Sequence, residues 1–173
     1  MPHYGTTTGA DAYHLASGNT AWSGTEADKA AALTRASAYV DSLALGKRTS
    51  GTTYTMFAGT KTGGRDQELA WPRTGAYDAD GTDISATSVP YEVVYATYEA
   101  ALRELTQPGY LSPDYVPAQS IKREKVDVLE TEYNAPSADM TNPMQPVTTL
   151  VQSMLAPLLV VSATSSSVGV MVV

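Results

Sequence analysis

The chain has 173 residues, of which 43% are hydrophobic, and it carries 18 acidic against 11 basic side chains and no cysteine. This length suits one domain with a core of its own, and the formal net charge of −7 disfavours a protein whose whole surface grips nucleic-acid phosphates. Without cysteine the chain has neither disulfides nor thiolate metal sites.

The chain opens without a basic-then-apolar leader, and no apolar run reaches the roughly 18 residues of a membrane-spanning helix. We therefore expect a soluble intracellular protein that makes no contact with a membrane.

Four segments have the apolar periodicity of α-helices. They are 9–15, 25–44, 90–106 and 147–156. Before the second segment, Ser23 and Glu26 have the spacing of a capping box, in which each side chain bonds the backbone N–H of the other residue. The fourth segment follows Pro146 and ends at Pro157. These segments predict a mainly α fold, a small α-helical bundle.

Tyrosines mark one face of the 90–106 segment. The apolar stripe there consists of Tyr91, Val94, Tyr95, Tyr98, Ala101, Leu102 and Leu105. We expect these side chains in the core, with the tyrosine hydroxyls reaching its rim. The alternative, a platform on which nucleic-acid bases stack, would need exposure and surrounding positive charge, and the neighbouring carboxylates argue against it.

The connection between the second and third helices, residues 46–88, contains the most basic part of the chain. Its DNA-facing candidates are Lys47, Arg48, Lys61 and Arg65. The run from Tyr54 to Phe57 predicts a short strand or one arm of a β-hairpin. The basic stretch is either a solvated loop or a contact with nucleic acid or an acidic partner.

A Trp-Pro pair lies near the end of this connection. Proline disfavours the α region for the residue before it, so we expect Trp71 to be extended, with a large ring that other residues must cover. Arg73 follows, before a turn signal at Thr74-Gly75. The pattern predicts a shaped connection between helices.

Residues 118–133 alternate apolar with polar side chains, which predicts an extended β arm. A lone strand leaves its hydrogen-bonding edges open, so we expect its partner to be the run from Tyr54 to Phe57 or another copy of the protein. The candidates for contacts between subunits or with the loop are Trp71, Arg73, Lys122, Arg123, Val126 and Val128.

The tail, residues 158–173, is too apolar for an ordinary disordered terminus. Left exposed it would promote aggregation, so we expect a partner to cover it by strand addition or in a groove. The candidate docking residues are Leu158, Leu159, Val160, Val161, Val168, Val170 and Val172. On this basis residues 1–157 form the helical domain, with the 46–88 insertion and the 118–133 arm, and 158–173 form a docking tail.

The sequence lacks the patterns of a catalytic or metal-binding protein. Only His3 and His14 could serve a catalytic triad or a histidine metal site. Asp78, Asp80 and Asp83 are faintly similar to a calcium loop, but without its closing glutamate they predict a turn with solvated carboxylates. We therefore expect no enzyme, no metal and no cofactor.

One set of motifs resembles a known family. The motifs are Ala10-Asp11-Ala12-Tyr13, Trp22 before Asp28-Lys29-Ala30-Ala31-Ala32-Leu33, Leu69-Ala70-Trp71-Pro72-Arg73-Thr74-Gly75, Asp80-Gly81 and Val89-Pro90. With the helix through Ala96 to Leu105, they resemble the head–tail connector, or adaptor, proteins of tailed bacteriophages. Some relatives of that family carry the label DnaT-like single-stranded-DNA-binding protein. The resemblance covers about residues 9–157.

The resemblance implies a helical bundle with a protruding loop or hairpin, assembled as a homo-oligomeric ring, usually twelvefold, beneath the portal protein of the capsid. Such a ring joins the portal to the tail, meets stopper or tail-terminator proteins, and surrounds passing genomic DNA without sequence-specific binding. It implies a place at the head–tail junction of the virion, after assembly in the host cytoplasm. Overall acidity would suit a channel through which DNA slides.

The alternative is a single-stranded-DNA-binding replication accessory module. It would use the 47–65 loop, with Tyr54 and Phe57, as a basic and aromatic surface. Such binding would weaken steeply with salt, which separates it from a structural connector.

Overall fold

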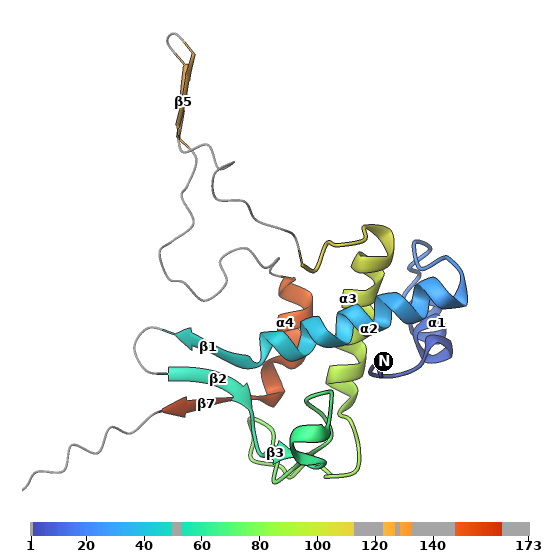
Figure 1. Cartoon of the computed structure of the whole chain (residues 1–173), viewed down its shortest axis with the longest axis vertical. Helices are drawn as coiled ribbons and strands as arrows, with labels where there is room; N and C mark the ends of the chain where they lie inside the picture. The colour runs from blue at the N-terminus through green and yellow to red at the C-terminus, as the bar shows by residue number, and fades with distance from the viewer. Residues whose placement is uncertain (1, 50–52, 113–122, 127–128, 133–147, 164–173) are drawn as a thin grey trace, which may run out of the picture.

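The computed structural model of the chain describes residues 2–49, 53–112, 123–126, 129–132 and 148–163 (Figure 1). The helices in these ranges are α1 (Thr7–Ala16), α2 (Glu26–Leu43), α3 (Tyr91–Thr106) and α4 (Thr149–Leu155), with short 3₁₀ turns at Gly64–Asp66 and Ala156–Leu158. The strands are β1 (Leu45–Thr49), β2 (Thr53–Phe57), β3 (Thr60–Lys61), β4 (Arg73–Thr74), β5 (Arg123–Val126), β6 (Leu129–Glu132) and β7 (Leu159–Ala163). The expected mainly α fold with a β-hairpin is confirmed.

The longest helix, α2, has its N-cap two residues after the Ser23 that the sequence pattern suggested. Thr25 is its N-cap, with its Oγ1 accepting from the backbone N–H of Asp28 at 3.2 Å. In return, a carboxylate oxygen of Asp28 accepts from the Thr25 backbone N–H at 3.2 Å. The capping box predicted for Ser23 and Glu26 is therefore formed by Thr25 and Asp28 instead, which have the same spacing.

The core lies where α2 packs across α3 and α3 packs against α4 (Figure 1). Many of its side chains are small, which lets the helix backbones approach closely. The fully buried residues include Ala32, Leu33, Ala36 and Val40 of α2, Val93, Ala96, Ala100 and Ala101 of α3, and Val151 and Leu155 of α4. None of the described helices is long and apolar enough to cross a membrane.

The buried face of α3 differs from the predicted tyrosine stripe. Tyr91 is 67% exposed and Tyr95 is 42% exposed, whereas Tyr98 is buried. Glu99 and Glu104, which are not part of the predicted stripe, are buried as well. The helix turns its alanines toward the core, and each buried carboxylate is paired with an arginine, which offsets its desolvation.

The largest sheet joins two distant parts of the chain. Its antiparallel order is β1-β2-β7, and β2 lies between the other two strands. In the β2–β7 pair, Phe57 is opposite Leu159. Leu158, just before β7, is 2% exposed. The first part of the predicted docking tail therefore belongs to the chain's own sheet and core, because β2 supplies the strand partner that we expected from another protein. Residues 168, 170 and 172 lie outside the described residues.

The predicted β arm is a hairpin that pairs with itself. β5 and β6 are antiparallel, with Arg123 opposite Glu132 and Lys125 opposite Glu130. The expected pairing of this arm with Tyr54 to Phe57 is therefore wrong, since each strand finds its partner a few residues away. In Figure 1 the hairpin lies apart from the helices. Lys122 and Val128 fall outside the described residues.

A buried polar network holds the Trp-Pro connection against α2. The Tyr4 hydroxyl donates to Asp41 at 2.6 Å and accepts from the backbone N–H of Trp71 at 3.1 Å. The second carboxylate oxygen of Asp41 accepts from the backbone N–H of Ala70 at 2.8 Å. Burial raises the pKa of Asp41 above its usual range and also raises that of Tyr4. Trp71 is 2% exposed, and its peptide bond to Pro72 is cis. Its ring packs edge-on against Phe57, with 5.3 Å between the ring centroids.

Arg73 holds the same connection through backbone carbonyls. Its guanidinium donates to the carbonyl oxygens of Ala58 at 2.7 Å and of Ala70 and Phe57 at 3.3 Å each, and also to that of Gly59. Arg73 therefore contacts main-chain oxygens of this connection, whereas the expected contact was a charged one.

Candidate nucleic-acid interface

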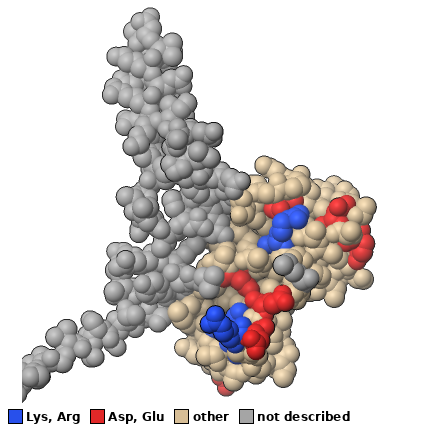
Figure 2. Space-filling model, in the orientation of Figure 1, with Lys and Arg blue, Asp and Glu red and all other residues tan. Residues whose placement is uncertain are grey.

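Most of the basic side chains on the helical body are already bound within the chain. Three form ion pairs: Lys29 with Asp11 at 2.7 Å, Arg35 with Glu104 at 2.6 Å, and Arg103 with Glu99 at 3.0 Å. On the face drawn in Figure 2, basic side chains accordingly lie directly beside acidic ones. A cation that is paired in this way offers little to a phosphate, because the partner carboxylate repels the same anion.

Two of the chain's other cations bond main-chain carbonyls. Arg73 does so as described above, and the Lys61 ammonium donates to the carbonyl oxygens of Gln67 at 2.8 Å and Glu68 at 3.4 Å. Lys61 was predicted to face DNA, but its ammonium holds the connection together. Arg65, in the Gly64–Asp66 turn, is exposed and makes no hydrogen bond or ion pair with the residues that the structure describes.

The remaining predicted pair, Lys47 and Arg48, lies on β1. In the sheet register Lys47 is opposite Thr55 and Arg48 is opposite Tyr54, so neither faces a carboxylate across the strands. Residues 45–57 contain no Asp or Glu at all. We call the antiparallel pair of β1 and β2, residues 45–49 and 53–57, the basic hairpin. It continues directly from the end of α2 (Figure 1).

The aromatic half of the predicted surface is only partly available. Phe57 is 4% exposed and packs in the core, so it cannot stack on a base.

The β5–β6 hairpin is the other basic candidate, but its register sets Arg123 and Lys125 opposite glutamates. Opposite charges on neighbouring strands attract one another in general, whereas the register of the basic hairpin places no acidic residue opposite Lys47 or Arg48.

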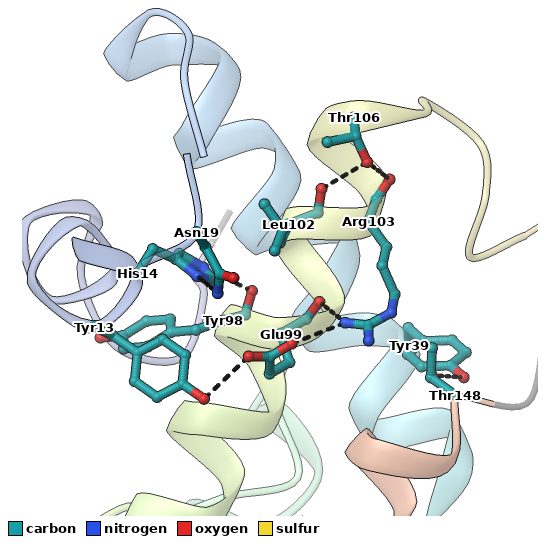
Figure 3. Close-up of polar contacts among 10 residues, drawn as sticks. All are labelled: Tyr13, His14, Asn19, Tyr39, Tyr98, Glu99, Leu102, Arg103, Thr106 and Thr148. Atoms are coloured by element: carbon teal, nitrogen blue, oxygen red, sulfur yellow. Dashed lines mark hydrogen bonds and ion pairs between the residues drawn. The ribbon is translucent and has the colours of Figure 1, made fainter. Parts of the chain in front are cut away.

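An aromatic cluster between α1 and α3 was not predicted from the sequence. The rings of Tyr13 and Tyr95 stack at 5.0 Å between centroids, and Tyr91 and Tyr98 adjoin Tyr95. The Tyr13 hydroxyl donates to Glu99 at 3.1 Å (Figure 3). Burial, with the nearby Glu99 carboxylate, raises the pKa of Tyr13 to about 12. The spacing of Tyr91, Tyr95 and Tyr98 along one helix face was the available signal, but nothing in it indicated Tyr13 as the partner.

The acidic turn after β4 has the predicted form. Asp78 accepts hydrogen bonds from the backbone N–H groups of Asp80 at 3.0 Å and Thr82 at 2.8 Å. Its carboxylate therefore shapes the turn. Across the part of the chain that the structure describes, no group of three or more His, Cys, Asp or Glu residues could hold a metal ion.

Comparison with known proteins gives one match. No curated protein and no solved structure matches the chain. A protein-family model described as "Putative DnaT-like ssDNA binding protein" matches residues 3–173. That description agrees with the label carried by some relatives of the connector proteins, and it does not itself mention a connector. Because the match spans nearly the whole sequence, the chain belongs to this DnaT-like family.

Proposed function

We propose that this protein binds single-stranded DNA and that the basic hairpin makes the contact. The proposal rests on one observation: Lys47 and Arg48 lie opposite uncharged residues, whereas the described cations of the helical body, Arg65 excepted, are bound within the chain. The family description supports the same function. Binding, without catalysis or a cofactor, is all that this arrangement requires.

The number of available cations sets the strength of the proposed contact. Lys47, Arg48 and Arg65 would neutralise about two or three phosphates. A plot of the logarithm of the binding constant against the logarithm of the salt concentration should therefore have a slope of about −1.4 to −2. The net charge of −7 adds long-range repulsion. We therefore expect weak binding that is measurable at low salt.

The test is a pair of double variants with the same change in charge. Fluorescence anisotropy with a labelled oligothymidylate of about ten nucleotides measures the affinity at low salt. Lys47→Gln with Arg48→Gln should weaken binding about tenfold or more, because each lost phosphate contact removes counterion release. Arg123→Gln with Lys125→Gln on β5 is the matched control and should weaken it far less. Equal losses in both, or no binding by the wild-type chain, would refute the proposal.

A second candidate function is the head–tail connector of a tailed bacteriophage. The specific observation in its favour is the β5–β6 hairpin, which among the residues that the structure describes has no other strand partner and lies apart from the helices (Figure 1), as a segment that reaches a neighbouring subunit would. On this proposal the chain forms a ring, usually twelvefold, between the portal and the tail proteins of the virion. Genomic DNA passes through it, and Val168, Val170 and Val172 contribute to portal docking.

Electron microscopy of assembled particles tests this second function. Gold-labelled antibody against the chain should mark the single tail vertex. Deletion of residues 164–173 should then abolish tailed particles, and because it leaves β7 intact it separates docking from folding. Unlabelled particles from cells that express the protein would exclude the connector function and leave single-stranded-DNA binding.

A further inference from the structure

A pocket of about 320 Å³ lies between the end of α1 and the start of α2. Its lining includes Asp11, His14, Leu15, Asn19, Trp22 and Lys29. The basic hairpin follows the other end of α2, so the two features lie at opposite ends of this helix. None of the DNA-facing residues predicted from the sequence lines this pocket.

His14 fixes the orientation of one polar side chain in the pocket. Its Nε2 lies 3.2 Å from the carbonyl oxygen of Tyr98, and a carbonyl only accepts, so Nε2 carries the proton. Burial lowers the pKa of His14, which favours the neutral ring. The unprotonated Nδ1 therefore accepts from the Asn19 amide nitrogen at 3.1 Å (Figure 3). This bond determines which end of the Asn19 amide is nitrogen and which is oxygen.

The rest of the Asn19 amide is unused. Its Oδ1 and its second Nδ2–H form no hydrogen bond with the residues that the structure describes. Together they are an acceptor beside a donor on one planar group. Nucleobases present the complementary pattern on their edges, where an N–H or amino group lies next to a carbonyl oxygen or a ring nitrogen.

The other lining groups suit an uncharged planar ligand. The indole N–H of Trp22 and the Lys29 ammonium both donate to the same oxygen of Asp11, each at 2.7 Å. Lys29 is thereby neutralised, and the pocket has no free charge for a phosphate. Trp22 adjoins His14 with 4.6 Å between ring centroids, and Leu15, 84% exposed, offers apolar surface at the pocket.

We infer that this pocket binds one nucleobase of single-stranded DNA, with Asn19 hydrogen-bonding to the edge of the base. The inference rests on the proposed single-stranded-DNA binding. The Lys29 ammonium has two further N–H donors and cannot accept a hydrogen bond. A base that carries a carbonyl oxygen can accept from it, so such a base is favoured over adenine. Thymine, cytosine and guanine meet that condition. The basic hairpin supplies charge and the pocket supplies base recognition.

Variants of the full-length chain test the inference, with labelled oligothymidylate and oligoadenylate as probes. Asn19→Ala should weaken oligothymidylate binding about five- to tenfold and oligoadenylate binding less. Leu15→Ser, at an exposed position that the core does not use, should weaken both. Gln152→Ala on α4 is the matched amide control and should bind as the wild type does.

Nuclear magnetic resonance provides an independent readout. The signals of the Asn19 side-chain amide and the Trp22 indole N–H should shift on titration with oligothymidylate, while that of the buried Trp71 indole should not. One outcome separates the two proposals: Lys47→Gln with Arg48→Gln loses binding, Asn19→Ala and Leu15→Ser retain it, and neither signal shifts. The pocket inference is then wrong, and the proposed function stands. If no oligonucleotide binds at low salt, both are wrong.

Discussion

At the scale of single residues, His14 couples the protonation of one ring to the stability of the fold. It is 1% exposed, between Tyr13 and Trp22, and burial lowers its pKa below the ordinary value of 6.5. In the unfolded chain the ring returns to its ordinary pKa, so below that pH the unfolded state binds more protons than the folded state. The contribution of His14 to stability is therefore lost as the pH falls.

We predict that the free energy of unfolding decreases between about pH 7 and pH 5, and that His14→Gln makes this decrease smaller. Urea unfolding at several pH values measures both. Glutamine cannot take up a proton in this range, although it can still donate to the Tyr98 carbonyl. An identical pH dependence in the two proteins would contradict this role of His14.

Arg73 is predicted to stabilise the fold through the planar geometry of its guanidinium more than through its charge. Lysine keeps the charge but cannot spread planar donors over several carbonyl oxygens, so Arg73→Lys should destabilise the fold by about 1–2 kcal/mol and Arg73→Ala by about 2–4 kcal/mol. Arg65→Lys, an exposed position in the same connection, is the control and should change stability by less than about 0.5 kcal/mol. Thermal or urea unfolding gives the comparison. Equal stability of Arg73→Lys and the wild type would show that charge alone suffices.

At the scale of elements, the start of α2 distinguishes two capping residues of similar chemistry. Thr25 bonds the Asp28 backbone N–H, whereas Ser23 precedes the helix by several residues. Thr25→Ala should therefore cost about 1 kcal/mol in the free energy of unfolding, while Thr25→Ser should retain most of it. Ser23→Ala should have almost no effect. A larger loss at Ser23 than at Thr25 would mean that the helix begins where the sequence pattern first suggested.

The elements differ in how far a local pattern can predict them. Periodicity located α1, α2 and α3, because each has its own apolar repeat. The buried face of α3 was missed, since tyrosine and alanine are both apolar and only the facing helix decides which is covered. The pairing of β5 with β6 could have been predicted from charge, because the basic residues of β5 are opposite acidic residues of β6, as Arg123 is opposite Glu132. The pairing of β2 with β7 had none, because nothing local links strands so far apart.

The candidate interface was predictable to a similar degree. Lys47 and Arg48 were two of the four basic candidates in the 47–65 stretch, and the structure places them on β1, opposite uncharged residues of β2. Lys61 and Arg73 bond main-chain carbonyls, and carbonyls have no sequence signature. The orientation of Asn19 depends on the buried tautomer of His14, which depends in turn on Tyr98. An orientation that depends on a second and a third residue cannot be predicted from residue spacing.

At the scale of the whole molecule, β7 is predicted to belong to the cooperative fold. Truncation after Pro157 removes the buried Leu158 and the strand that pairs with β2, so the melting temperature should fall sharply and the product should aggregate. Truncation after Ala163 removes no residue that the structure describes, and should leave the melting temperature within about 2 °C of the wild type. Calorimetry of both products provides the measurement. Equal melting of the two would show that β7 is dispensable.

The central position of β2 also affects how the protein folds during synthesis. Met56 pairs with Val160, about a hundred residues further along the chain, so the sheet cannot close until nearly all of the protein has left the ribosome. Until then one edge of β2 is open to any other strand, including that of a second nascent chain. Crowded synthesis on one messenger RNA should favour exchange of β7 between copies, whereas refolding at high dilution should yield closed monomers.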